Sequence, residues 1–172
     1  MHDIKEDIYR LCEVLWPITR SITGNGVRET LSIIQQEISN LTIHEVPTGT
    51  QCFDWKIPKE WNIKDAYIID PDGKKIIDFQ DSNLHVVSYS TPINQTVPLA
   101  ELQEHLHSLP EQPNAIPYVT SYYEERWGFC LTENQRKTLK EGNYQVCINS
   151  ELSDGSLTYG ELIIHGKSEK EV

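Results

Sequence analysis

The sequence predicts an α+β fold in which two N-terminal helices precede a β-rich region with two short helices. Two observations predict this class. Apolar residues recur at three- and four-residue spacing up to position 38, and from position 42 short apolar segments alternate with proline and glycine turns. The 172 residues fit one domain, or one domain with a substantial appendage, and can bury a hydrophobic core without disulfides.

Each of the first two predicted helices has one apolar face. The first helix should end near Leu15, because Pro17 disfavours the α conformation for the residue before it. Asn25 is the expected N-cap of the second helix. The apolar residues are Ile4, Ile8, Leu11, Cys12 and Leu15 in the first helix, and Val27, Leu31, Ile34 and Ile38 in the second. Two such faces joined by a short connector predict packing on a common core.

Strands are predicted where β-branched and aromatic residues lie between turn signals. The clearest hairpin signal is Asp70-Pro71-Asp72-Gly73, because proline presets the turn and glycine supplies positive φ. The expected strands are 42–46, 66–69, 74–79, 127–131, 144–148 and 158–164.

Two short helices are predicted within the β-rich region. One should run over residues 97–106 with Thr96 as its cap. The other follows Thr132, whose spacing from Gln135 matches a capping box, and should end near residue 142.

The charge balance argues against two classes of partner. Fifteen Lys and Arg against 26 Asp and Glu give a net charge of −11, whereas nucleic acids and anionic membranes require a basic surface. Residues 1–7 have charges of mixed sign, and no apolar run reaches the roughly 20 residues of a membrane span. We therefore predict a soluble, cytoplasmic protein that binds neither nucleic acid nor membrane.

The sequence contains no complete catalytic or metal-binding motif. C-x-x-C, H-E-x-x-H, G-x-S-x-G and P-loop patterns are all missing. His105 and His107 are two residues apart on a predicted helix, so they cannot bind one ion together. Residues 24–26 with Arg20 and Arg28 could hold an anion at a helix start, although a plain connector is the favoured interpretation.

Aromatic residues and one arginine gather between positions 118 and 129. Such a group can line a ligand cleft or a protein interface, or it can form core beside a charged loop. The candidate substrate-binding residues are Tyr122, Tyr123, Arg126 and Trp127, and no residue is named as catalytic or metal-binding.

Several longer motifs together resemble a known family. They are WPITRSITG at 16–24, EVPTGT at 45–50, FDW at 53–55 with PKEWNI at 58–63, TSYY at 120–123 with WGFC at 127–130, and DGSLTYGE at 154–161. In this order they resemble a bacterial family of uncharacterised aminopeptidase-like proteins that is associated with polysaccharide biosynthesis. The resemblance covers essentially the whole chain.

The resemblance implies a co-catalytic zinc aminopeptidase with a doubly wound α/β core and an inserted β-rich domain of unknown function. Residues 1–55 would form the N-terminal helices and first strand of a truncated core, 56–152 the insert, and 153–172 the strand that returns to the core. The family's zinc ligands follow the segment that matches residues 165–168. None therefore transfers to this chain, and zinc is expected only in a full-length member.

The resulting hypothesis is a non-catalytic N-terminal part of a zinc hydrolase, inactive alone, whose insert shapes substrate access. The expected partners are the missing C-terminal catalytic segment or a second copy of the chain, and a peptide or aminoacyl substrate in the full-length protein. A truncated core would expose apolar helix faces, so self-association or partial disorder of the two N-terminal helices is expected. The alternatives are a freestanding protein- or saccharide-binding module and, more remotely, a Cys–His enzyme centred on Cys130.

Overall fold

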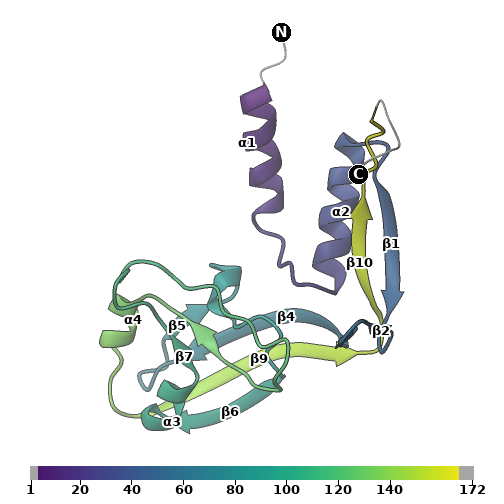
Figure 1. The fold of residues 1–172 in the computed structure, drawn as a ribbon. Coiled ribbons are helices and arrows are strands. Elements are labelled where there is room, and N and C mark those ends of the chain that lie inside the picture. Colours follow the sequence, from purple (N-terminus) through teal and green to yellow (C-terminus); the bar gives the residue numbers. More distant parts are fainter. Residues whose placement is uncertain (1–3, 167–172) are drawn as a thin grey trace.

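The computed structural model describes residues 4–166 and confirms the predicted α+β class (Figure 1). The helices are α1 (Ile4–Leu15), α2 (Asn25–Glu37), α3 (Leu99–Glu104) and α4 (Glu133–Lys137), with a short 3-10 helix at Asn83–His85. The strands are β1 (Thr42–Pro47), β2 (Gln51–Cys52), β3 (Trp55–Lys56), β4 (Glu60–Ile69), β5 (Lys75–Asp78), β6 (Ile93–Pro98), β7 (Leu106–His107), β8 (Phe129–Cys130), β9 (Asn143–Ser153) and β10 (Ser156–Glu161).

A four-stranded antiparallel sheet with the order β5-β4-β9-β6 contains the main hydrophobic core. Strand β9 has the period-2 pattern of a sheet with one buried face, since Tyr144, Val146 and Ile148 are at most 1% exposed. Leu102 of α3 and Phe129 of β8 are fully buried in the same cluster. The core therefore lies on one face of this sheet, beneath α3 and β8.

A second part of the molecule is an antiparallel ribbon of β1 and β10, on which α2 packs (Figure 1). The contact is close because Gly160 has no side chain: a Cβ there would lie 3.1 Å from the Leu31 side chain. Strand β1 leads through the β2–β3 hairpin into β4, and β9 leads directly into β10. The sheet therefore lies between β1 and β10 in the sequence and joins the ribbon through two segments.

Helix α1 stands beside α2 (Figure 1), and the apolar residues in its first half are exposed. None of its residues is buried, and Ile4 and Ile8 are 72% and 60% exposed. The expected packing of both N-terminal helices on one core is therefore not seen within residues 4–166. Among the described residues, every helix is too short or too polar to cross a lipid bilayer. Residues 1–3 and 167–172, which the predicted division assigns to the core, lie outside the described part.

Several local predictions are wrong. The helix after Thr132 ends at Lys137 and not near residue 142. The helix predicted over residues 97–106 begins only at Leu99, because residues 93–98 form the edge strand β6 and pair with β9. Thr96 is consequently a strand residue opposite Gln145 and caps nothing. The last strand covers Ser156–Glu161, whereas residues 158–164 were predicted, and Ile164 is 84% exposed.

Two local predictions based on side-chain chemistry are confirmed. Thr132 and Gln135 form the capping box of α4, with Gln135 N donating to Thr132 Oγ1 at 3.0 Å. The hairpin between β4 and β5 turns at residues 70–73, where Asp70 Oδ1 accepts hydrogen bonds from the Asp72 and Lys74 amides. Both signals are local in sequence, so packing does not override them.

Candidate functional site

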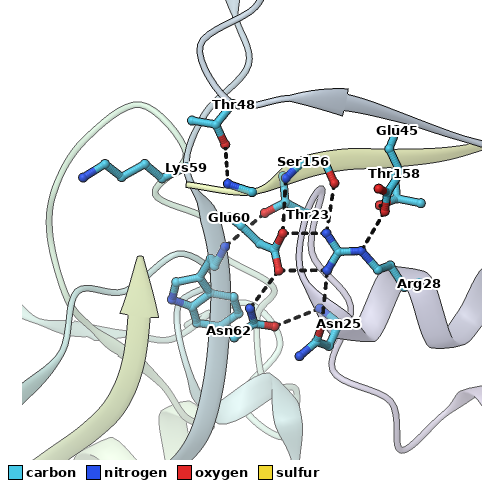
Figure 2. A network of polar contacts seen from close by, with 12 residues as sticks. Thr23, Asn25, Arg28, Glu45, Thr48, Lys59, Glu60, Asn62, Ser156 and Thr158 are labelled. Carbon is cyan, nitrogen blue, oxygen red and sulfur yellow. Dashed lines mark hydrogen bonds and ion pairs between the residues drawn. The ribbon is translucent and has the colours of Figure 1, made fainter. Parts of the chain in front are cut away.

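Side chains from α2, β1, β4 and β10 converge where the ribbon joins the sheet, around the guanidinium of Arg28 (Figure 2). Nη1 and Nη2 of Arg28 donate to Oε1 and Oε2 of Glu60 at 2.8 and 2.5 Å. Nε donates to Glu45 Oε1 at 3.0 Å, and Nη2 also donates to Ser156 Oγ at 3.0 Å. One arginine thus connects the helix, both ribbon strands and the first residue of β4.

This arrangement strongly favours the charged forms of both groups. The Arg28 guanidinium lowers the pKa of Glu60 from its ordinary value of 4.5 to about 2, mainly through hydrogen bonds to the ionised carboxylate. Burial acts in the opposite direction, and Asn62 and the Ser156 amide add smaller stabilising hydrogen bonds. Glu60 in turn raises the pKa of Arg28. At neutral pH both side chains therefore stay charged and form an ion pair. Neither is suited to act as a general acid or base.

The start of α2 is capped by a residue from the sheet. Asn25 was predicted as the N-cap, but the cap position is Gly24, which makes no side-chain capping bond. The Asn25 amide instead donates to Asn62 Oδ1 at 2.8 Å (Figure 2). Asn62 therefore takes one amide of residues 24–26, and Glu60 takes the Arg28 guanidinium, so two of the groups that the anion-binding interpretation would use already have partners within the chain.

Two glycines permit this close approach. Gly24 has φ +95°, and a Cβ there would lie 2.2 Å from the Trp61 carbonyl oxygen. A Cβ at Gly155 would lie 2.2 Å from Glu60 Oε2. A larger residue at Gly24 would overlap the backbone of β4, and one at Gly155 would overlap the Glu60 side chain.

Tyr89 connects the junction to an aromatic group. It is 5% exposed, has a positive φ of 69°, and stacks on Trp61 with ring centroids 5.8 Å apart. Its hydroxyl bonds Thr23 Oγ1 and donates to the Lys59 carbonyl oxygen at 3.1 Å. Burial raises the pKa of Tyr89 to about 12, so the hydroxyl stays protonated at neutral pH. Tyr122 packs edge-on against this ring at 5.1 Å.

The structure brings two of the four predicted substrate-binding residues together. Tyr122 and Tyr123 contact each other edge to face, with centroids 6.4 Å apart, and Tyr123 is 82% exposed. Both line a cleft of about 320 Å³ that also contains Lys59, Glu124 and Glu125. We call this the acidic cleft.

Arg126 and Trp127 do not line the acidic cleft. Trp127 stacks on His105 at 3.6 Å and packs against the core of the β-rich part. Arg126 Nη2 donates to the Thr120 carbonyl oxygen at 3.0 Å. These two residues therefore support the loop that carries Tyr122 and Tyr123. Of the four predicted substrate-binding residues, two line the acidic cleft and two point away from it.

A second cleft of about 500 Å³ lies on the other side of Tyr122, between the α1–α2 connector and the β-rich part. Residues 16 and 18–22 form one wall. Trp61, Ser88, Tyr118 and Tyr122 lie on the other. We call it the connector cleft.

The described residues do not form a zinc site, and the Cys130 thiol does not fit the role of a nucleophile. Within residues 4–166 no three His, Cys, Asp or Glu side chains converge on a point where they could bind a metal ion. Cys130 is fully buried, and burial raises the pKa of its thiol to about 12. A thiolate at this position is strongly disfavoured, which argues against the Cys–His enzyme alternative.

Sequence reasoning missed the Arg28–Glu60 pair and the role of Tyr89. Arg28 and Glu60 are 32 positions apart, and neither lies in a motif that predicts pairing. Tyr89 lies in a loop after the 3-10 helix, where an aromatic residue with positive φ has no sequence signature. Both contacts depend on how the ribbon meets the sheet.

Comparison with known proteins supplies the family context. A family model described as "Domain of unknown function (DUF2172)" matches residues 60–151. A Clostridium acetobutylicum protein named "Putative polysaccharide biosynthesis protein with aminopeptidase-like domain" is 55% identical over 166 residues, which is 96% of this chain and 38% of that protein. A crystal structure of a "putative peptidase" from the same organism matches with TM-score 0.89 and 55% identity, covering 96% of this chain and 39% of that chain. This chain therefore spans less than half the length of these relatives.

Proposed function

The chain belongs to the DUF2172 family, and we propose that it is the N-terminal, non-catalytic part of an aminopeptidase-like hydrolase. In this proposal the β-rich region shapes the access of a peptide or aminoacyl substrate. The observation that carries it is the 55% identity, across 96% of this chain, to a protein named for its aminopeptidase-like domain. Since the chain covers 38% of that protein, the catalytic residues would belong to the remaining length.

We propose the division into core residues 1–55 and 153–172 and an insert at 56–152. The chain path supports it, because β1 and β10 pair with each other while the four-stranded sheet lies between them in the sequence. The Arg28–Glu60 pair supports a fixed orientation of the insert, since it connects α2 directly to the first residue of β4. An insert that shapes access must be held in a defined position relative to the core.

The acidic cleft supports a substrate with a free amine. Glu124 and Glu125 line it beside Tyr122 and Tyr123, whose rings can contact an apolar side chain. Among the described residues that line it, Glu124 and Glu125 outnumber Lys59, the one cation, so the cleft would attract the α-ammonium of a peptide or aminoacyl compound. We propose that zinc, if the longer protein uses it, takes its ligands from the remaining length, as the family resemblance implies.

The uncovered face of α1 supports a macromolecular partner. Ile4, Ile8 and Tyr9 are each at least 60% exposed on one helix. We propose that the remaining part of the longer protein covers this face. In the isolated 172-residue chain, a second copy would take its place.

The test compares the longer gene product with the 172-residue chain on a panel of aminoacyl p-nitroanilides. We expect hydrolysis by the longer protein and none by the chain alone. In the longer protein, Tyr123→Ala should raise KM several-fold with little change in kcat, because Tyr123 would contact substrate without taking part in chemistry.

Phe53→Ala is the matched control, since Phe53 is an exposed aromatic residue that lines neither cleft. It should leave KM unchanged. Absence of hydrolysis by the longer protein across the panel would refute the peptidase assignment. An unchanged KM for Tyr123→Ala would refute the role of the acidic cleft.

A further inference from the structure

The connector cleft differs from the acidic cleft in its charge. Although the protein has 26 acidic residues, no carboxylate is among the described residues that line this cleft. Arg20 is the one charged side chain among them. The cleft therefore favours a ligand with a single negative charge and offers no partner for an ammonium group.

The remaining polar groups of the cleft are neutral hydroxyls and amides. Ser21 Oγ and Ser88 Oγ bond each other at 2.8 Å, and Ser88 is only 6% exposed. The hydroxyls of Tyr118 and Tyr122 bond each other at 2.9 Å, and Asn83 also lines the cleft. Each of these pairs uses one hydroxyl hydrogen and leaves the other hydrogen and several lone pairs, which matches a ligand that carries several hydroxyl groups.

Aromatic side chains stand at the rim. Trp16 and Tyr118 line the cleft and are 74% and 62% exposed. Exposed aromatic rings of this kind bury area against a flat, partly apolar ring without losing much side-chain entropy. The volume of about 500 Å³ is sufficient for one or two sugar rings.

We propose that the connector cleft binds a sugar ring that carries one carboxylate. Arg20 would hold the carboxylate, the rim aromatics would stack on the ring, and the serine and tyrosine hydroxyls would bond its hydroxyl groups. Arg20 Nη1 already donates to the Leu15 carbonyl oxygen, which fixes the side chain beside the cleft and leaves other N–H groups of the guanidinium for a ligand. A phosphate, with up to two charges, usually recruits more cationic or backbone donors than a single arginine.

The test is equilibrium binding to the 172-residue chain, followed by NMR, with D-glucuronate, methyl glucoside, acetate and uridine monophosphate as probes. We expect D-glucuronate to bind at least tenfold more tightly than the glucoside or acetate, and more tightly than the nucleotide. The shifted signals should include the Trp16 indole and the amides of residues 19–22 and 118–122. Binding does not depend on hydrolysis, so its outcome is separate from that of the proposed peptidase function.

Variants identify the contributing groups. Arg20→Gln should reduce D-glucuronate affinity about tenfold and remove the preference over the glucoside, because glutamine keeps a donor but loses the charge. Tyr118→Ala should weaken D-glucuronate and glucoside alike. Arg10→Gln is the control. Arg10 is an exposed arginine of α1 whose guanidinium lies 3.6 Å from the Glu37 carboxylate, and it does not line the connector cleft.

Several results would overturn the proposal. Equal affinity for D-glucuronate and acetate would indicate a simple anion site, and tighter binding of uridine monophosphate would indicate a phosphate site. Shifts located outside the connector cleft would place the sugar elsewhere. If Arg20→Gln perturbs the fold, the NMR signals that D-glucuronate shifts in the unmodified chain still show whether it binds in the connector cleft.

Discussion

Replacing Glu60 by glutamine should destabilise the protein by about 2–3 kcal/mol at pH 7. The change keeps the size and most of the packing of the side chain but removes the charge that Arg28 binds through two hydrogen bonds. Arg28 would then remain at a partly buried junction with only Glu45 as an anionic partner. Loss of one member of such a pair leaves a charge without full compensation.

The magnitude follows from the pKa of Glu60. Its folded-state value of about 2 lies about 2.5 below the ordinary value of 4.5. At about 1.36 kcal/mol for each pKa unit, this corresponds to about 3.4 kcal/mol as an upper value. The Glu60 side chain is 10% exposed and that of Arg28 is 31% exposed, so solvent screening reduces the expected loss to about 2–3 kcal/mol.

The same pair makes stability depend on pH. Because the folded state lowers the pKa of Glu60, the unfolded chain binds a proton more readily than the folded chain does. The stabilisation is therefore complete well above pH 4.5 and is lost as the pH falls from about 4.5 to about 2. By pH 3 less than half of it should remain.

Urea unfolding followed by tryptophan fluorescence at pH 7 and at pH 3 measures both effects. Asp72→Asn is the control: its partner Lys140 lies 2.6 Å away, but both side chains are more than 60% exposed, so the urea midpoint should hardly change. A loss below about 1 kcal/mol for Glu60→Gln at pH 7 would refute the argument. The argument would also be refuted if the free energy of unfolding of Glu60→Gln differed from that of the unmodified protein by the same amount at pH 7 and at pH 3.

Three further predictions concern single positions. Gly155→Ala should cost about 1–3 kcal/mol in urea unfolding, because its Cβ would overlap Glu60 Oε2; an unchanged midpoint would show that β10 moves freely. Thr132→Ala should cost about 1 kcal/mol by removing the capping box with Gln135, whereas Thr132→Ser should retain most of the stability. Cys130 should react with a thiol reagent only on unfolding, and fast modification of the native protein would contradict its burial.

Local chemistry made several elements predictable from sequence. The 3.6-residue spacing located both N-terminal helices, and α1 ends at Leu15 as the following proline requires. The Asp70–Gly73 turn and the Thr132 capping box were predictable because their hydrogen bonds connect residues at most four positions apart. Each of these signals is complete within one short segment.

Competition between elements was not predictable in the same way. Thr96 and Pro98 satisfy the rules for a helix start, yet pairing with β9 makes residues 93–98 a strand. The hydrogen bonds of the sheet edge outweigh a helix turn whose benefit is local. Only the placement of β9 decides between the two.

For the candidate site, sequence identified the aromatic loop but not the direction of its side chains. Tyr122 and Tyr123 line the acidic cleft, while Trp127, four positions later, stacks on His105. A composition rule treats these residues alike. Their different roles arise because β8 pairs with β7 and draws the end of the loop towards the core.

The sequence by itself determined the α+β class, the helix at each end of the connector, the tight turns and the acidic charge, because these depend on residues near one another in the chain or on composition. The tertiary structure alone decided the junction and the two clefts. Arg28 meets Glu60, and Tyr89 meets Thr23, across 32 and 66 positions. Contacts at that separation form only when the ribbon and the sheet are positioned against each other, and no local pattern encodes that geometry.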